Sequence, residues 1–287
     1  MNRDPRLVEH RLGGHHVVAA SVAGVQTCIL LPELDLCFDI GRCPVAAVHR
    51  RTVLISHGHV DHLGGLVHHV ALRSMWRMAP SRVVVPRDIL PDVEALLAVW
   101  RRIARTPLPC ELLGVEPEDQ VALDRGVTVT AVEASHRVPT LAWLVERTRA
   151  RLRRDLVGLA GSEIAARHRA GEEVREPHTS LEVGFTADTR AALLDREPRL
   201  MEVRLLVCEC TFVDDPLCEP DDALAERADR TGHLRLQDLA VRADRFANEA
   251  VLLTHFSSRY SAARIREGIA SLPAPLRDRV VPLICVP

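Results

Sequence analysis

The chain has 287 residues, of which 47% are hydrophobic and 26% are charged, and its formal net charge at pH 7 is -2. This composition is typical of a globular protein with one large domain or two small ones. It excludes a membrane-spanning segment, because no apolar run is long enough, and the near-neutral charge argues against indiscriminate binding to nucleic acid.

The cellular compartment is predicted from the N-terminus and the cysteines. Residues 1–6 lead into no apolar core of the kind that a signal peptide has, so we expect a cytoplasmic protein. None of the eight cysteines has the paired spacing of a zinc finger, and we expect reduced thiols that lie mostly in the core.

The first half of the chain predicts a run of strands that is followed by alternating strands and helices. Gly24 and Pro32-Glu33 separate apolar runs that predict strands at 15–22, 26–31 and 34–40. The apolar runs at 52–56 and 83–85 predict buried strands, and helical spacing of apolar residues predicts helices at 63–75 and 89–103.

The second half continues this alternation. Two strands are predicted around Asp124-Arg125-Gly126 within 121–132, with further strands at 141–145, 204–207, 251–253 and 280–286 and helices at 236–246 and 262–270. This order fits an α/β sandwich of mixed sheets with helices outside. We find no repeat and no domain boundary, and we expect one domain over residues 1–287.

One segment departs from the pattern. Five arginines fall within eight residues, namely Arg147, Arg149, Arg151, Arg153 and Arg154. A polar stretch with helical potential follows at 161–174. Two interpretations stay open: a solvated excursion, or a short protruding arm at about 147–178 whose arginines bind the phosphates of a nucleic acid.

The most informative motif is His57-Gly58-His59-Val60-Asp61-His62, which directly follows the predicted strand 52–56. Imidazole nitrogen and carboxylate oxygen are ligands that suit zinc and similar divalent ions. Asp61 and His62 can point to a different place from His57 and His59, as a two-metal site requires. A solvated histidine-rich turn is the alternative, and the strand-loop-helix context disfavours it.

Three more candidate ligands stand at the ends of predicted strands, namely His136, Asp188 and His255. Each of them taken alone would more often be structural. Ligands in an α/β sandwich are expected on loops after strands at one edge of the sheets, so their repeated placement predicts that they complete a dinuclear centre. For eight of the 14 histidines we expect structural or solvent-exposed positions, namely His10, His15, His16, His49, His68, His69, His168 and His178.

With these residues the chain resembles the metallo-β-lactamase superfamily, and more narrowly tRNase Z (ribonuclease Z) in the short form found in plants. The resemblance runs from about Gly13 to the C-terminus. The superfamily shares the histidine loop, whereas the stretches specific to tRNase Z are Cys208-Glu209-Cys210-Thr211-Phe212, Gly232-His233 and Thr254-His255-Phe256-Ser257-Ser258-Arg259-Tyr260. The resemblance implies an αββα sandwich of two mixed β-sheets with outer helices.

The resemblance also implies two zinc ions per subunit, although Mn²⁺ or Fe²⁺ could occupy the same ligands. One ion would be held by His57, His59 and His136, the second by Asp61, His62 and His255, and Asp188 would bridge them. Asp61 would also orient the water that attacks a phosphodiester and accept its proton.

Further roles follow from the same resemblance. His233 would protonate the departing 3′ oxygen while Glu209 holds its imidazole in the right tautomer, and Arg259 would stabilise charge on the phosphoryl oxygens. The implied reaction is removal of the 3′ trailer from precursor tRNA. The family usually forms homodimers, and no membrane partner is implied.

Two departures from the family bear on this expectation. Residues 19–26 lack the Pro- and Arg/Lys-rich loop with which many bacterial relatives reject tRNA that already carries CCA, so that discrimination stays open. Ala187 stands where a glycine usually precedes the bridging aspartate. We expect alanine to be tolerated there if its φ angle is negative.

Two other functions stay open. A hydrolase of small molecules, such as a phosphodiester, a cyclic nucleotide or a lactone, would share the metal loop and need no arm. A catalytically silent subunit or zinc-binding scaffold is disfavoured, because every ligand and both residues of the acid pair are present.

Overall fold

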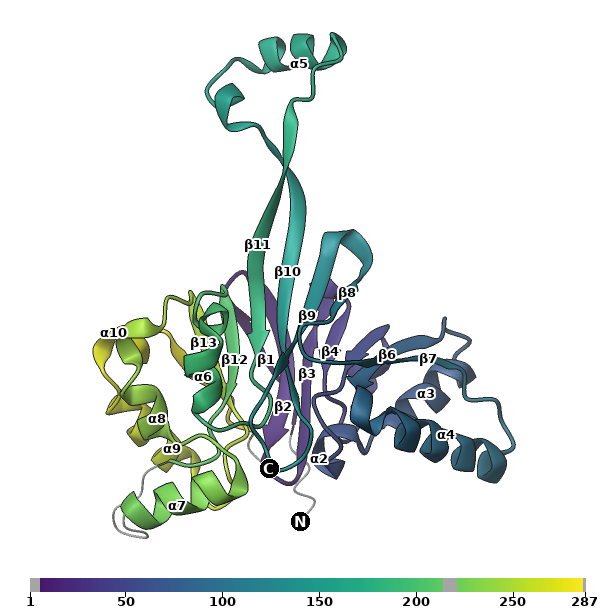
Figure 1. The fold of residues 1–287 in the computed structure, drawn as a ribbon, viewed down its shortest axis with the longest axis vertical. Helices are drawn as coiled ribbons and strands as arrows, with labels where there is room; N and C mark the ends of the chain where they lie inside the picture. Colours follow the sequence, from purple (N-terminus) through teal and green to yellow (C-terminus); the bar gives the residue numbers. More distant parts are fainter. Residues whose placement is uncertain (1–5, 214–220, 286–287) are drawn as a thin grey trace.

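Two seven-stranded sheets pack face to face in the computed structural model, which describes residues 6–213 and 221–285 (Figure 1). Helices lie on the outer sides of the sandwich. The expected fold of two mixed sheets with outer helices is therefore confirmed. In the described part of the chain, no helix has the length and apolar character needed to cross a membrane.

The N-terminal sheet is antiparallel from β1 to β4 and parallel from β4 to β7. In spatial order its strands are β1 (Val8–Leu12), β2 (His15–Val22), β3 (Gln26–Leu31), β4 (Leu36–Phe38), β5 (Thr52–Leu54), β6 (Ser81–Pro86) and β7 (Cys110–Val115). The helices packed on it or following its strands are α1 (Val45–Val48), α2 (Val60–Leu63), α3 (Leu66–Met75) and α4 (Leu90–Ala104).

The C-terminal sheet is antiparallel from β8 to β11 and parallel from β11 to β14. Its strands are β8 (Gln120–Ala122), β9 (Val127–Glu133), β10 (Leu141–Leu152), β11 (Arg175–Phe185), β12 (Leu205–Glu209), β13 (Ala250–Thr254) and β14 (Val280–Pro282). The later helices are α5 (Gly161–Arg169), α6 (Ala192–Arg196), α7 (Asp221–Thr231), α8 (Leu236–Ala240), α9 (Ala262–Ala270) and α10 (Ala274–Arg277).

The central core lies between the two sheets. Phe38 of β4 stacks on Phe185 of β11 with ring centroids 4.9 Å apart, and Trp143 of β10 is fully buried beside them. Because aromatic residues make up only 3% of the chain, valine, leucine, isoleucine and alanine form most of this core. This close-packed apolar interface fixes one sheet against the other, and hence the loops at their shared edge.

β2, β3 and α9 have the predicted bounds. The helix predicted for 236–246 ends at Ala240, and a separate 3-10 turn follows at Ala243–Arg245. The strand predicted for 280–286 ends at Pro282, and residue 286 lies outside the described residues. β1, β7 and α7 were not predicted: α7 is largely polar, and the outer strands are half exposed.

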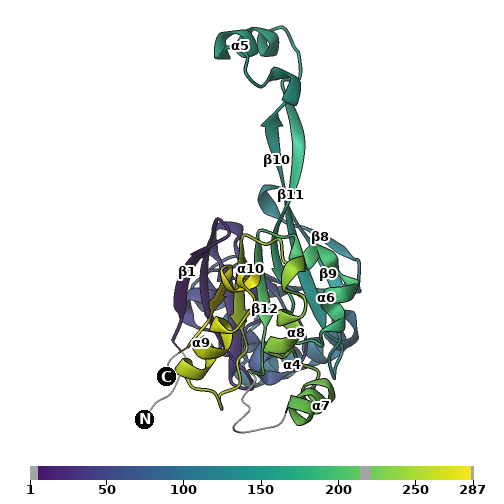
Figure 2. The same cartoon turned by 90° about the vertical axis from the view of Figure 1, so that its left-hand side faces the viewer.

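β10 and β11 continue beyond the sheet as a two-stranded ribbon that carries α5 at its end (Figures 1 and 2). The strand predicted for 141–145 therefore continues to Leu152 and includes most of the arginine-rich segment. Of the polar stretch 161–174, only Gly161–Arg169 is helical. The loops after β5, β9, β11, β12 and β13 meet at the opposite end of the sandwich from this arm.

Candidate metal centre

The histidine loop follows β5, where the chain leaves the core abruptly. Ile55, Ser56 and His57 are fully buried, and α2 begins two residues after the sharp turn at Gly58. The backbone of Asp61 lies so close to Gly41 that a Cβ at position 41 would fall 2.0 Å from the Asp61 carbonyl oxygen. Glycine at position 41 thus allows the loop to sit against the end of β4.

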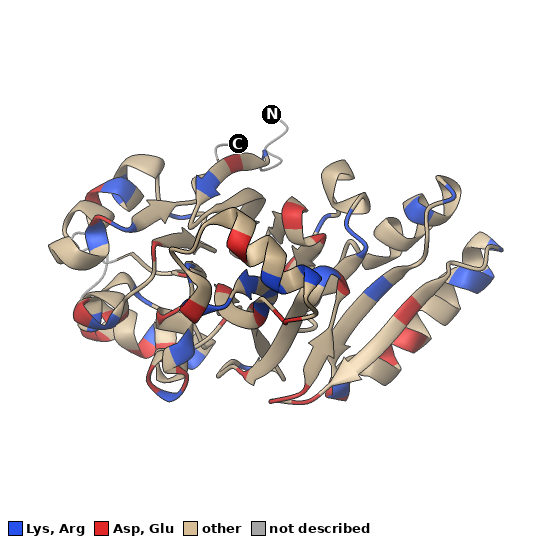
Figure 3. Ribbon diagram, turned by 90° about the horizontal axis from the view of Figure 1, so that it is seen from above, with Lys and Arg blue, Asp and Glu red and all other residues tan. Residues whose placement is uncertain are grey.

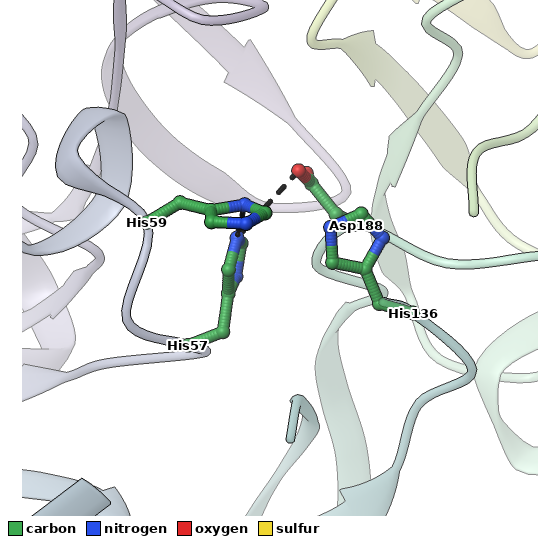
Figure 4. A group of neighbouring side chains, drawn as sticks. All are labelled: His57, His59, His136 and Asp188. Carbon is green, nitrogen blue, oxygen red and sulfur yellow. Dashed lines mark hydrogen bonds and ion pairs between the residues drawn. The ribbon is translucent and has the colours of Figure 1, made fainter. Parts of the chain in front are cut away.

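Four side chains form the first group of candidate ligands, namely His57, His59, His136 and Asp188, and their ligand atoms all lie within 4.8 Å of one another. Figure 4 shows them pointing toward one another from three different loops. Nε2 of His57 lies 2.9 Å from Nδ1 of His59 and 3.7 Å from Oδ2 of Asp188.

A second group consists of Asp61, His62 and His255. Nε2 of His62 and Nε2 of His255 lie 3.4 Å apart, and each lies 3.7 Å from Oδ2 of Asp61. Asp188 stands between the two groups, with Oδ2 3.4 Å from His62 and Oδ1 3.4 Å from His255. The structure thus brings together all seven residues that the sequence suggested as ligands.

The chemistry of these atoms fits divalent ions. Nδ1 of His136 donates to the carbonyl oxygen of Gly232 at 2.8 Å, so Nε2 carries the lone pair, and that buried nitrogen has no hydrogen-bond partner in the described structure. Burial also lowers the pKa of His57, His59 and His136. These imidazoles are therefore neutral near pH 7, the form that binds metal.

The second group carries a proton when no metal is bound. Burial lowers the pKa of His62, but the carboxylates of Asp188 and Asp39 outweigh this effect and hold the pKa well above its usual value. Burial raises the pKa of Asp188, but the imidazoles of His255 and His62 outweigh it and hold that pKa well below its usual range. Metal binding at this group would therefore displace a proton.

Asp39, to which the sequence analysis assigned no role, lies beneath the histidine loop. Its carboxylate is fully buried and accepts hydrogen bonds from Nδ1 of His62 at 2.7 Å and from the Ser56 amide and hydroxyl at 2.7 and 2.8 Å. This contact fixes the His62 ring with Nε2 as the free ligand atom. The signal in the sequence was a carboxylate inside the apolar run 34–40, which was predicted as one strand, whereas β4 ends at Phe38.

Glu209, which is buried, and His233, which is partly buried, form a pair beside both groups. Nδ1 of His233 donates to Oε1 of Glu209 at 3.0 Å, and the His233 ring lies 4.9 Å from the ring of His136 and 5.3 Å from that of His255. Burial lowers the pKa of His233, but the Glu209 carboxylate outweighs this effect and raises it. The pair can therefore hold a proton next to the candidate metal centre.

Thr211 links this pair to the second group, and the sequence analysis gave it no separate role. Its hydroxyl donates to Oε2 of Glu209 at 2.7 Å, so its oxygen accepts from Nδ1 of His255 at 2.8 Å. The arrangement leaves Nε2 of His255 free to bind a metal ion. The sequence could have indicated a role for Thr211 only through its position two residues after Glu209.

The remaining predicted site residues lie outside this cluster. Arg259 is exposed, and its guanidinium lies 5.6 Å from the centroid of Phe212, whose ring is 6.2 Å from that of His233. Arg147, Arg149 and Arg151 pair with residues 176–180 in the other half of β11, away from the cluster. His178, the strand partner of Arg149, precedes Phe185 by seven residues, or about 23 Å of extended chain.

Two expectations about the family departures can be compared with the structure. Alanine at position 187 was expected to be tolerated if its φ angle is negative, and this condition is not met, because Ala187 has φ 53°, in the left-handed region. Residues 22–26 form a tight turn between β2 and β3, and the amide of Gly24 donates to Oδ2 of Asp61 at 2.8 Å. The short turn thus contacts the candidate centre directly.

Comparisons with known proteins identify the family. The model of the beta-lactamase superfamily domain matches residues 41–256. The tRNase Z TRZ1 of Arabidopsis thaliana is 33% identical over 275 residues, covering 95% of this chain and 96% of the relative. The ribonuclease Z of Pyrobaculum neutrophilum is 32% identical over 280 residues, covering 91% of this chain and 84% of the relative.

Solved structures agree on the fold. The metallo-beta-lactamase fold protein YhfI of Bacillus subtilis has a TM-score of 0.60 at 15% identity, covering 94% of this chain and 95% of that one. The short form of human tRNase Z has a TM-score of 0.53 at 17% identity, covering 99% and 97%. The chain therefore belongs to the tRNase Z (ribonuclease Z) family of metallo-β-lactamase-fold hydrolases.

Proposed function

We propose that this protein is a zinc-dependent endoribonuclease that removes the 3′ trailer of precursor tRNA. The observation that carries the proposal is the Glu209–His233 pair beside the two ligand groups. A phosphodiester with a poor leaving group, such as the 3′ oxygen of a ribose, needs a proton donor at that oxygen, and His233 is placed to be one.

The two ligand groups, Asp61 and the Glu209–His233 pair would have separate roles in the reaction. Zinc ions at the two groups would supply a hydroxide nucleophile near neutral pH and positive charge for the phosphoryl oxygens. Asp61, held by the Gly24 amide, would orient the attacking water and accept its proton. His233 would give its proton to the leaving oxygen, and Glu209 would keep the imidazole in the donating orientation.

The arginines of the arm are the second argument for the proposal, because they suit a large substrate with many negative charges. Arg147, Arg149 and Arg151 occupy alternate positions of β10 and share one face of the ribbon with Ser180, His178 and Glu176. On the other face, the hydroxyls of Thr148 and Thr179 are hydrogen bonded at 2.8 Å. Arg149 and Arg151 are exposed and form no salt bridge in the described structure, so they are free to bind phosphates.

The tip of the arm differs from the ribbon. Arg153 pairs with Asp155 at 2.6 Å and with Glu172 at 3.2 Å, and Arg167 pairs with Glu163 at 3.2 Å. In the view from above, basic and acidic segments are intermixed across the ribbon diagram (Figure 3). We assign the phosphate-binding role to the ribbon face for this reason, and among the predicted arm residues we give Arg153 a structural role.

A matched pair of arm variants tests the substrate class. We expect the double variant Arg149→Ala/Arg151→Ala to lose cleavage of precursor tRNA and to keep hydrolysis of bis(p-nitrophenyl) phosphate. Arg175→Ala is the control, because Arg175 lies opposite Leu152 on the other face of the same ribbon. Zinc-loaded protein that cleaves the small ester but leaves precursor tRNA intact would instead indicate a small-molecule phosphodiesterase.

We further propose a homodimer. The ribbon arginines lie at the opposite end of β11 from the centre of their own chain, so RNA held on one arm would reach the centre of a second copy more readily. Mixing Asp61→Ala subunits with Arg149→Ala/Arg151→Ala subunits should restore tRNA cleavage. Restored cleavage would support a dimer in which the arm of one subunit holds RNA at the metal centre of the other. Absence of restoration would contradict this arrangement.

A further inference from the structure

The direction of the arm is fixed at a small region where it leaves the sheet. The last residue of β10 that pairs with β9 is Arg147, and the first residue of β11 that pairs with β12 is Val183. Beyond these positions the arm consists of two strands with no neighbouring strand in the described chain. Whatever holds this root therefore sets the angle of the whole arm.

A β-bulge lies at the root. Val145 pairs with Val183 and Glu146 pairs with Leu181, so Glu182 is an extra residue with no partner across the ribbon. Bulges of this kind bend a strand and increase its twist. The side chain of Glu182 is nevertheless 2% exposed, which is unusual for a carboxylate unless it is paired.

Glu182 is paired with groups from three parts of the fold. Its Oε1 accepts from the Ser180 hydroxyl at 2.6 Å, and its Oε2 accepts from Nε2 of His15 at 3.1 Å and from Nη1 of Arg204 at 3.5 Å. Burial raises the pKa of Glu182, but the hydrogen bond from Ser180 and the charges of His15 and Arg204 outweigh this and lower it. The carboxylate is thus ionised, and it ties the arm to the opposite sheet, because His15 belongs to β2.

Arg204 is itself held in place. Its guanidinium donates to both oxygens of Glu249 at 2.8 and 3.1 Å, and its amide donates to the carbonyl of Leu181. Gly14, with φ 77°, packs so closely that a Cβ there would lie 2.6 Å from Nη2 of Arg204. The turn between β1 and β2 therefore packs against the guanidinium of Arg204, which also binds Glu182 at the root of the arm.

We propose that Glu182 is a positioning residue that sets the angle of the arm and thereby aligns a bound RNA with the catalytic centre. The inference rests on the proposed function for its effect on RNA cleavage. The mechanical part, a fixed arm angle, does not depend on it. Because the hydrogen-bond partners of Glu182 are Ser180, His15 and Arg204, none of them a candidate ligand, its loss should affect substrate positioning and leave the chemistry intact.

The test combines a distance measurement with kinetics. Spin labels are placed on Ser162 in the arm and Glu94 on α4, both exposed, through an unnatural ketone amino acid so that the native cysteines do not react. We expect Glu182→Ala to broaden the distance distribution and Glu182→Gln to restore most of it, because the amide oxygen still accepts hydrogen bonds. Glu173→Ala is the control that removes an exposed carboxylate from the arm.

In kinetics, Glu182→Ala should raise KM for precursor tRNA about tenfold with kcat and hydrolysis of bis(p-nitrophenyl) phosphate unchanged, as expected when a pre-organised binding geometry is lost. An unchanged distance distribution, or a broadened one with unchanged KM, would overturn the proposal. If Glu182→Ala does not fold, Ser180→Ala removes one partner and should give a smaller change in the same direction. If wild-type protein does not cleave precursor tRNA, the proposed function fails, and the distance measurement still decides whether Glu182 fixes the arm.

Discussion

Asp39 accepts a hydrogen bond from Nδ1 of His62 at 2.7 Å, and both side chains are buried beneath the histidine loop. The contact orients a candidate metal ligand from the side opposite to the metal. An amide at position 39 would keep the shape and lose the charge that stabilises the donating ring nitrogen. Loss of a hydrogen-bond partner behind a ligand typically weakens metal affinity.

We therefore predict that Asp39→Asn weakens zinc binding about 10- to 100-fold, the range usual for loss of a partner behind a ligand. Competition with a chromophoric chelator measures the affinity directly. Asp35→Asn is the matched control, because Asp35 also has a positive φ and lies outside the cluster. Equal zinc affinities for both variants and the wild type would show that Asp39 does not contribute to metal binding.

Ala187 has φ 53° directly before the bridging aspartate, and its methyl group lies in the core between the sheets. Ala187→Gly loses that buried methyl but relieves about 1–2 kcal/mol of left-handed strain, so we expect almost no change in the free energy of unfolding. Ala131→Gly in the same core has no strain to relieve and should cost about 1.5 kcal/mol. Urea unfolding of the two variants measures the difference, and equal losses would contradict the strain.

His69 on α3 is fully buried, and neither of its ring nitrogens has a hydrogen-bond partner in the described structure. Burial and the nearby Arg73 lower its pKa to about 3, whereas the pKa in the unfolded chain is 6.5. The unfolded chain therefore takes up a proton first as the pH falls. The contribution of neutral His69 to stability is present above pH 6.5 and is lost progressively as the pH falls toward 3.

Replacing this residue should make the protein less sensitive to acid. We predict that His69→Leu raises stability relative to wild type by about 2 kcal/mol more at pH 5 than at pH 7, from the pKa difference over that interval. Urea unfolding of metal-free protein at both values gives the result. His68→Leu changes the exposed neighbour and is the control, and the same pH dependence in both variants would refute the assignment to His69.

His233 is placed to protonate a leaving oxygen, so its importance should depend on that leaving group. We predict that His233→Ala slows cleavage of precursor tRNA by roughly 10²- to 10⁴-fold, the usual range for a lost general acid. Hydrolysis of bis(p-nitrophenyl) phosphate should slow much less, because p-nitrophenolate leaves without a proton. Single-turnover rates of wild type and variant on both substrates measure the two effects. An equal decrease in rate on both substrates would argue against proton donation by His233.

The local parts of the site were predictable from the sequence. His57, His59, Asp61 and His62 share six positions, and a strand that ends abruptly must present them at the sheet edge. His136, Asp188 and His255 were found because each follows an apolar run. The local pattern of apolar runs followed by histidine or aspartate therefore indicated which residues could be ligands. Only the packing of the two sheets brings their ligand atoms close to one another.

The contacts between distant segments could not be predicted. Pairing of Glu182 with His15 spans 167 positions and depends on the bulge in β11 and on the sandwich of the two sheets. The same holds for Asp39, whose position within the predicted strand 34–40 gave no indication of the ring that it would contact. The left-handed φ of Ala187 is likewise imposed by the turn toward the ligand cluster, against the preference of alanine.

The most direct test maps the cleavage site on a precursor tRNA with a 3′ trailer, using zinc-loaded wild-type protein and Asp61→Ala in parallel. Our account predicts cleavage directly after the discriminator base by wild-type protein and loss of that cleavage by orders of magnitude in the variant, with tRNA binding retained. No cleavage by metal-loaded wild-type protein, or cleavage that is unaffected by Asp61→Ala, would contradict it.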